Sequence, residues 1–175
     1  MATPLTRNRA VRWALIAVGA AALGYALQTL IPIVIWRSRW QPGIDALRRF
    51  MKRFGNRKEV QRAGTPGSRT TAVHHVGRTS GREYVTPVWA ERVGDHFYIH
   101  LPYGTGTDWC KNVVAAGGCV LVHDGTRYST TAPTLLPAAE ARPLLSPATR
   151  RMQQIIDAQF YLRLDIEGGA PRPLR

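Results

Sequence analysis

The sequence predicts a mainly β (α+β) protein: a small antiparallel β-barrel with inserted and C-terminal helices, preceded by one N-terminal transmembrane helix. Three observations lead to this prediction. A 24-residue run without any charge lies near the N-terminus. About five short strand-like runs, joined by hairpin signals, follow residue 64. A helical pattern follows the third run, and further helical patterns end the chain.

The uncharged run extends from Trp13 to Trp36. As a helix it is about 36 Å long, enough to cross a hydrocarbon core of about 30 Å. A tryptophan lies at each end, where aromatic anchors meet the membrane interface. A cleaved signal peptide is the alternative. It is less favoured because its apolar region is usually about 7–15 residues long and no small-x-small cleavage site follows.

Basic residues flank this run on both sides and account for most of the net charge of +13. Residues 1–63 hold twelve Lys and Arg against two acidic residues, whereas the rest of the chain holds twelve against nine. Three arginines precede the run and six cations follow within twenty residues, which predicts that the barrel lies on the cytoplasmic side of a single-pass membrane protein. The following helical pattern places Ile44, Leu47, Met51 and Phe54 on one face. This helix either lies on anionic membrane lipids or packs on the domain.

Composition divides the chain into five segments. They are a basic N-terminus at 1–12, the transmembrane helix at 13–36, a basic amphipathic juxtamembrane segment at 37–63, the barrel domain at 64–167 and a disordered tail at 168–175.

Within the barrel, strands are expected at 70–76, 84–93 and 96–101. Pro87 implies an edge strand or a bulge, and Gly94-Asp95 predicts a hairpin. A helix is expected to begin at Asp108 as N-cap and to end at Gly117. A hairpin across Asp124-Gly125 follows. Helices are then expected over 138–145 and 146–164, with Ser146 as N-cap of the second.

Several kinds of site are disfavoured by spacing. His74 and His75 are adjacent in a strand and point to opposite faces, and His96 and His100 lie about 13 Å apart, so no metal site is predicted. No nucleophile elbow or P-loop is present in the sequence. Cys110 and Cys119 form no CxxC pair, which is compatible with a reducing compartment.

Two loops carry more polar groups than their turns need. The turn from Gly77 to Gly81 contains two glycines that allow an anion-binding nest, and Arg78, Thr79, Ser80 and Arg82 add donors. The alternative is a plain polar hairpin tip. A second loop offers an aromatic and polar groups at a helix start: Tyr103, Gly104, Asp108, Trp109, Lys111 and Asn112. Two such loops on one small barrel favour a planar, anionic ligand.

Residues 70–135, with these motifs, resemble the deazaflavin-dependent nitroreductase family, a branch of the split β-barrel flavin- and deazaflavin-binding oxidoreductases. The resemblance rests on the Gly77–Gly81 motif, Thr86-Pro87, Tyr103-Gly104, and Trp109 with Asn112. The chain departs from the family pattern at two positions. Thr79 stands where members often have lysine, and Tyr103 replaces a Ser-Lys or similar pair.

The resemblance implies a split barrel that binds coenzyme F420, a reduced 8-hydroxy-5-deazaflavin with a phosphate and a polyglutamyl tail; FMN is the alternative cofactor. Arg78, Thr79 and Ser80 would contact the phosphate or tail, and charge and proximity add Arg82. The implied ring contacts are Tyr84, Val85, Thr86, Pro87, Val88, Trp89 and, on the opposite wall, His100, Leu101, Pro102 and Tyr103. The implied contacts at the helix start are Asp108, Trp109, Cys110, Lys111 and Asn112.

The function that this resemblance implies is that of a membrane-anchored oxidoreductase, which transfers a hydride to an organic acceptor such as a lipophilic quinone or a nitro compound. Tyr161 is the candidate catalytic residue, since its hydroxyl could donate to the developing oxyanion of the acceptor, with Phe160 or Tyr161 stacking on it. Simple packing is the alternative for both aromatics. A non-catalytic carrier of deazaflavin or FMN, and an adaptor for protein contacts, also stay open.

Overall fold

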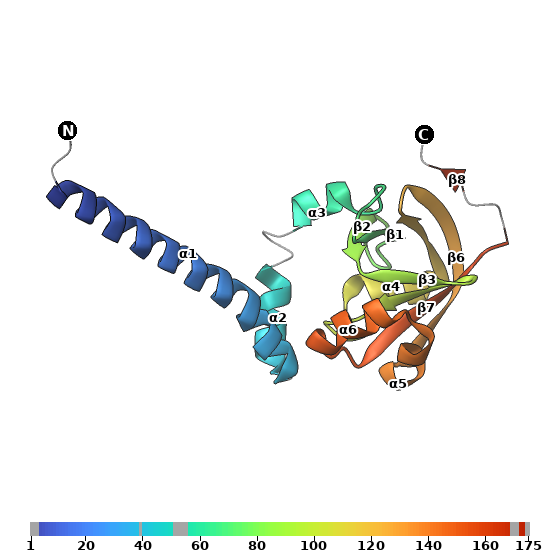
Figure 1. Cartoon of the computed structure of the whole chain (residues 1–175). Helices are drawn as coiled ribbons and strands as arrows, with labels where there is room; N and C mark the ends of the chain where they lie inside the picture. The colour runs from blue at the N-terminus through green and yellow to red at the C-terminus, as the bar shows by residue number, and fades with distance from the viewer. Residues whose placement is uncertain (1–3, 39, 51–55, 169–171, 174–175) are drawn as a thin grey trace.

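The computed structural model describes residues 4–38, 40–50, 56–168 and 172–173. Three helices come first: α1 (Pro4–Arg37), α2 (Gln41–Phe50) and α3 (Asn56–Arg62). Figure 1 shows α1 projecting away from the β-domain, with α2 beside its C-terminal end.

The predicted apolar helix is present within α1. Val11–Ile35 is a 25-residue stretch that is long and apolar enough to cross a membrane, and its most apolar part is not buried in the protein. A signal sequence near the N-terminus meets the same criterion, so this helix is an anchor or a signal sequence. Ile44 in α2 is buried, whereas the side chains of Leu47, Met51 and Phe54 lie outside the described residues.

The β-domain is built on one antiparallel sheet with the strand order β2-β1-β5-β6-β7-β4-β3. Its strands are β1 (Thr71–Val76), β2 (Glu83–Val88), β3 (Ala90–Val93), β4 (His96–His100), β5 (Gly118–His123), β6 (Thr126–Pro137) and β7 (Phe160–Ile166). The two outermost strands of this order, β2 and β3, are consecutive in the chain and are separated by Trp89 alone. The sheet must therefore curl until its edges meet at Trp89. Figure 1 shows the curled sheet.

Both predicted hairpins are confirmed. Val93 pairs with His96 across Gly94-Asp95. His123 pairs with Thr126 across Asp124-Gly125, and both of these turn residues have positive φ, at 47° and 74°, as a type I′ turn requires. Pro87 lies in β2, the first strand of the sheet order, so it is in an edge strand as predicted. An edge strand tolerates a residue without an N–H because one of its sides pairs with no other strand.

The helical prediction for 146–164 is wrong in its second half. Helix α6 (Pro147–Ile156) begins as expected, because the Thr149 N–H donates to Ser146 Oγ at 3.3 Å. It ends before Asp157, whose φ is +49°. The next residues form β7, in which Leu162 and Leu164 are fully buried on alternate positions. This period of two is the strand signal that the helical interpretation missed.

Two smaller differences concern the predicted helices. The N-cap of α4 (Asp108–Ala116) is Thr107, so Asp108 is the first helical residue; Gly117 ends the helix in the left-handed conformation as predicted. The expected helix at 138–145 divides into α5 (Ala138–Ala141) and a 3-10 helix, η2 (Arg142–Leu144), since Pro143 cannot donate within an α-helix.

Part of the tail that was predicted to be disordered is paired. Arg172–Pro173 forms β8, which pairs with the first two residues of β6. The pairing of β6 with β7 begins only at Thr130, so this side of the start of β6 is open to another strand. Residues 169–171 and 174–175 of the predicted tail lie outside the described part of the chain.

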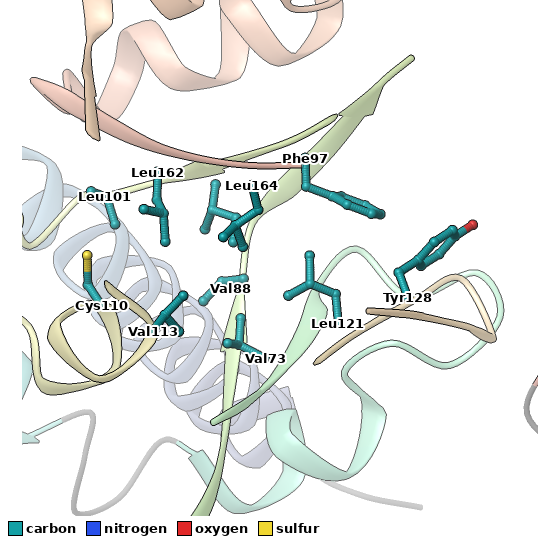
Figure 2. Close-up of a cluster of buried hydrophobic side chains, with 11 residues drawn as sticks. Val73, Val88, Phe97, Leu101, Cys110, Val113, Leu121, Tyr128, Leu162 and Leu164 are labelled. Carbon is teal, nitrogen blue, oxygen red and sulfur yellow. The ribbon is translucent and has the colours of Figure 1, made fainter. Parts of the chain in front are cut away.

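The main core fills the inside of the curled sheet (Figure 2). It consists of Val73, Val88, Phe97, Ile99, Leu101, Cys110, Val113, Leu121, Tyr128, Leu162 and Leu164. Figure 2 shows Cys110 and Val113 of α4 beside the strand residues, so α4 covers this core. On the outer face of β4 and β7, Tyr98 and Tyr161 pack with Ala138, Ala141 and Leu145 in a second cluster beneath α5 and η2.

Candidate functional site

The turn between β1 and β2 closes largely on itself. The Gly77 N–H donates to the Arg82 carbonyl at 2.8 Å, and the Gly81 N–H donates to the Gly77 carbonyl at 2.8 Å. The Arg82 N–H donates to Ser80 Oγ at 3.4 Å. These N–H groups are already used, so the backbone of the turn can offer an anion only the N–H groups between the two glycines. The side chains of the turn add further donors, and residues 78–82 are all exposed.

Gly77 is required for close approach rather than for a left-handed conformation. A Cβ at this position would collide with Ser80 Oγ and would lie 2.9 Å from the ring of Tyr84. Ser80 Oγ and the Tyr84 hydroxyl are themselves 3.3 Å apart. The glycine thus lets a hydroxyl and an aromatic ring fold over the base of the turn.

Arg78 joins this turn to the start of α4. Its Nη1 donates to Asn112 Oδ1 at 2.8 Å and to the Asp108 carbonyl at 3.4 Å, and its backbone N–H donates to the same Asn112 oxygen at 3.2 Å. Its Nη2 lies 3.7 Å from Asp108 Oδ1 in an exposed ion pair. The two loops that the sequence singled out therefore meet in the structure, through Arg78.

The contact continues inward to His75, which sequence reasoning did not select. Asn112 Nδ2 lies 3.1 Å from His75 Nδ1, and His75 Nε2 lies 3.1 Å from Thr86 Oγ1. The Tyr84 ring stacks on the imidazole at 5.7 Å between centroids. Burial lowers the pKa of His75, and the charge of neighbouring His74 lowers it further. The signal available in the sequence was position: His75 shares the inward face of its strand with Val73 and lies two residues before the turn.

The strand 83–88 does not present its five implied ring contacts to one side. Val88 belongs to the main core, whereas Val85 packs on the outer group of Ala63, Ala72 and Val122. Because successive strand side chains alternate, Tyr84 and Thr86 share the face of Val88, and Pro87 shares that of Val85. Trp89 follows between β2 and β3 and is half-buried.

The implied opposite wall is mostly interior. Leu101 lies in the main core, and His100 is 2% exposed. The imidazole of His100 lies between the rings of Trp89 at 6.2 Å and Tyr161 at 5.4 Å. Burial, aided by the charge of Arg142, lowers the pKa of His100 to about 4. Neither ring nitrogen has a hydrogen-bond partner among the described residues.

The next two residues of this wall, Pro102 and Tyr103, are half-buried, and burial raises the pKa of the Tyr103 hydroxyl.

The predicted residues of α4 divide by their burial. Asp108 and Lys111 are exposed, Trp109 packs against the edge of the core, and Asn112 is buried. Cys110 is a core side chain, and burial raises the pKa of its thiol to about 11 against the opposing effect of Lys111. Of these residues, only the exposed and polar ones are placed to meet a ligand directly.

Tyr161 lies in the second cluster rather than on an open surface. Its side chain is fully buried, and it pairs with His100 across β7 and β4. Burial raises the pKa of its hydroxyl, while a hydrogen bond with Arg142 lowers it. In this position the hydroxyl faces the covering 3-10 helix, so contact with an acceptor would require that cover to move. Phe160 is 41% exposed and remains accessible.

Two hollows are found in the described part of the chain, and only the first lies beside these elements. One, of about 240 Å³, is lined by Thr105, Cys110, Lys111, Val114, Ala115 and Leu135, on the side of α4 beside β6. The other, of about 450 Å³, is almost wholly apolar and lies along the end of α1, away from the polar turn. Among the residues that the structure describes, no group of three His, Cys, Asp or Glu side chains could hold a metal ion.

Comparison with known proteins yields only distant structural similarity. No family model matches the chain, and no curated protein matches its sequence. A pyridoxamine 5′-phosphate oxidase of Listeria innocua, named as putative, is 10% identical, with a TM-score of 0.44 over 61% of this chain and 89% of that chain. A protein named F420 reductase is 10% identical, with a TM-score of 0.42 over 67% of this chain and 96% of that chain.

A Clostridium acetobutylicum protein related to general stress protein 26 is 15% identical, with a TM-score of 0.43 over 71% of this chain and 89% of that chain. TM-scores below 0.5 at these identities carry no argument about what this chain binds or catalyses.

Proposed function

We propose that this protein is a membrane-anchored oxidoreductase that binds a reduced deazaflavin coenzyme and serves hydride transfer to an organic acceptor. The observation that carries the proposal is the contact of Arg78 with Asn112, which joins the two loops that the family resemblance implies as the coenzyme site. A plain hairpin tip has no need of a guanidinium that is hydrogen-bonded to a helix residue 34 positions away in the sequence.

The turn fits the anionic end of such a coenzyme. Arg78 and Arg82 place two exposed cations beside Thr79 and Ser80 in the turn, and the exposed Lys111 adds a third on the helix that Arg78 contacts. Two exposed carboxylates lie nearby, Asp108 and Glu83, and the exposed pair of Asp108 with Arg78 is worth about 0–1 kcal/mol. A phosphate or a tail carboxylate therefore competes with a weak partner, and it gains charge-assisted hydrogen bonds.

The edge strand fits the length of the coenzyme. From Glu83, beside the turn, to Val88 the backbone advances about 17 Å at about 3.3 Å per residue. The half-buried Trp89 follows at the far end, and its carbonyl accepts the His100 N–H at 3.0 Å. A ligand with an anion at one end and a flat ring at the other would lie along β2, with its ring against Trp89 and the loop that begins at Leu101.

A reduced deazaflavin supplies a two-electron hydride when it is bound. The contribution of this chain is to hold and orient the coenzyme, through cations at one end and aromatic contacts at the other. Tyr161 is covered, so its hydroxyl is not assigned a contact with the acceptor. The proposed role of this chain is therefore orientation of the coenzyme.

If the helix α1 is a membrane anchor, it favours an acceptor that dissolves in the bilayer. An anchored barrel stays within a few nanometres of the bilayer and gains local concentration only for a substrate that partitions into it. A quinone meets this condition and accepts a hydride plus a proton. Nitroaromatic reduction would be a side activity of the same site. The cations that follow α1 would meet anionic lipid headgroups on the cytoplasmic side.

The binding test uses the full-length chain in detergent, titrated with the deazaflavin coenzyme and with FMN, by calorimetry and fluorescence. We expect micromolar or tighter binding of the deazaflavin. Arg78→Ala should weaken it by about 10- to 150-fold, the value of a charge-assisted bond of about 1.5–3 kcal/mol. Arg69→Ala, which removes an equal exposed charge at the opposite end of β1, is the control.

Each outcome of this titration has a distinct meaning. Equal affinities of the Arg78→Ala and Arg69→Ala proteins would reduce the turn to a hairpin tip. Binding of FMN alone would replace the cofactor. Tight deazaflavin binding without turnover of any acceptor would favour the carrier alternative.

The acceptor test compares two liposome mixtures that contain the same full-length protein. In one, a menaquinone analogue shares the bilayer with the protein; in the other, it is confined to separate liposomes. Faster quinone reduction in the first mixture is expected. Equal rates would remove the membrane-acceptor idea. A reporter fused after residue 175 tests topology, and a periplasmic or extracellular signal would overturn the cytoplasmic placement.

A further inference from the structure

We infer that His75 and Asn112 are positioning residues that make the anion-binding geometry of Arg78 depend on the protonation of a buried imidazole. The inference deepens the proposed function, and it rests on that function only where coenzyme binding is measured. Its basis is the direction of each hydrogen bond in the His75–Asn112–Arg78 chain.

The orientation of the Asn112 amide is fixed by Arg78. Two donors, the backbone N–H and Nη1 of Arg78, approach Asn112 Oδ1 at 3.2 and 2.8 Å, so this atom must be the amide oxygen. The amide NH2 then faces His75 Nδ1 at 3.1 Å, and that nitrogen must accept. The proton of the neutral ring is therefore on Nε2, which donates to Thr86 Oγ1 at 3.1 Å.

Protonation of His75 breaks this pattern at one point. An imidazolium carries a proton on both nitrogens, so Nδ1–H would face the NH2 group of Asn112. Rotating the amide by half a turn would satisfy His75, but it would turn the NH2 group toward both donors of Arg78. Asn112 is 5% exposed and has little water to compensate. No orientation of the amide serves an imidazolium and a seated Arg78 at once.

The other ionisable groups around the ring do not offer a substitute acceptor. They are His74 on β1, Arg78 in the turn, Glu83 and Tyr84 on β2, Asp108 and Lys111 on α4, and Cys119 on β5. Glu83 is exposed, and strand alternation turns it to the face opposite Tyr84, which stacks on His75. His74 and the two cations oppose a further positive charge. The Asp108 carboxylate is exposed and faces the outer side of Arg78, and burial raises the pKa of the Cys119 thiol to about 11.

Protonation of His75 should change the anion affinity of the site in the direction opposite to simple charge attraction. A new positive charge near an anion site strengthens anion binding as the pH falls. Loss of the seated Arg78 weakens it. We expect affinity for the deazaflavin coenzyme to fall as the pH drops through the lowered pKa of His75, by up to about tenfold per pH unit, until the contribution of Arg78 is lost.

Three variants test the chain by calorimetric titration between pH 8 and pH 5. His75→Asn keeps an acceptor near the position of Nδ1 and cannot titrate, so its affinity should stay constant. Asn112→Asp offers an oxygen to Arg78 and another to an imidazolium, so the acid-side loss should disappear, although the added negative charge lowers affinity at every pH. His74→Asn, at the adjacent histidine on the opposite face, should keep the acid-side loss but move it toward higher pH, because the charge of His74 no longer lowers the pKa of His75.

A ligand-free measurement keeps this inference separate from the proposed function. Nitrogen NMR of the full-length chain, with labelled histidine and arginine, should show His75 with its proton on Nε2 at pH 7.5. The Arg78 amide should shift as His75 titrates, and Asn112→Asp should raise the pKa of His75. A proton on Nδ1, or an Arg78 signal that ignores the titration, would overturn the inference even if the coenzyme binds. If neither coenzyme binds, the proposed function fails while the NMR result still decides the chain.

Discussion

Replacing Asn112 by leucine should measure how much α4 contributes to holding the polar turn. Leucine has the branched shape of asparagine, with bulkier methyl groups and no hydrogen-bonding group. The substitution strands His75 Nδ1, which is buried, and two donors of Arg78, which is partly exposed. A buried group left without its partner costs about 1–3 kcal/mol, whereas Arg78 can turn to water at about 0.5–1.5 kcal/mol.

The expected loss is therefore about 2–4 kcal/mol of the free energy of unfolding. For a domain of roughly a hundred residues this lowers Tm by about 10 °C, since 1 kcal/mol corresponds to about 4 °C or slightly more. Differential scanning calorimetry of the full-length chain in detergent measures the barrel transition. Lys111→Leu, at the adjacent exposed position, is the matched control and should change the stability by less than about 0.5 kcal/mol.

A double-mutant cycle with His75→Leu provides the refutation. When both partners are apolar, no buried acceptor is stranded, so Asn112→Leu should cost about 1 kcal/mol less in the His75→Leu background than in the wild type. Equal costs in the two backgrounds would show that Asn112 and His75 do not depend on each other. A cost no larger than that of Lys111→Leu would show that the buried network contributes little.

Three further predictions concern the core, the turn and pH. Leu121→Ala should cost about 2–5 kcal/mol by denaturant unfolding, because the side chain is fully buried, whereas the exposed Val114→Ala should cost less than about 1 kcal/mol; similar values would argue against this core. Gly77→Ala should cost about 1 kcal/mol, since the colliding Tyr84 ring is exposed and can move, and should weaken coenzyme binding; unchanged affinity would separate this ring from the site. The folded pKa of His100, about 4 against an unfolded 6.5, implies stability that is present above pH 6.5 and lost as the pH falls toward 4, by about 3 kcal/mol; His100→Phe should abolish that share of the acid loss measured by chemical unfolding, and an unchanged pH slope would contradict it.

Sequence patterns predicted the local parts of this fold well because those parts depend on local chemistry. The Asp124-Gly125 hairpin follows from turn residues that tolerate positive φ, and the cap at Ser146 follows from its side-chain oxygen. The strand at 160–166 was missed because its short apolar run continues a helical pattern, and only its partners β4 and β6 decide between the two. The pairing of distant strands is a tertiary property that single-sequence periodicity does not contain.

The candidate site shows the same division. The polar turn and the helix start could be selected from residue types, and the contact between Arg78 and Asn112 joins them. The sequence could not tell which implied residues face inward, because strand alternation separates neighbours such as Val85 and Val88. It also gave no sign that Cys110 would be a core side chain or that Tyr161 would be covered by η2.

The two most buried histidines near the site have opposite chemistry, and the difference assigns their roles. Both nitrogens of His75 are in hydrogen bonds, so this ring transmits orientation between β2, α4 and the turn. Neither nitrogen of His100 has a partner among the described residues, and aromatic rings lie on both of its sides. A ring held only by stacking contributes shape, which phenylalanine supplies equally well at neutral pH. His100→Phe should therefore leave stability at pH 7.5 within about 1 kcal/mol of wild type, whereas His75→Phe should lose more than that, because it strands the amide of Asn112. If the two variants lose equal stability, His100 depends on a polar partner as His75 does, and that partner would lie on the outer face of β4.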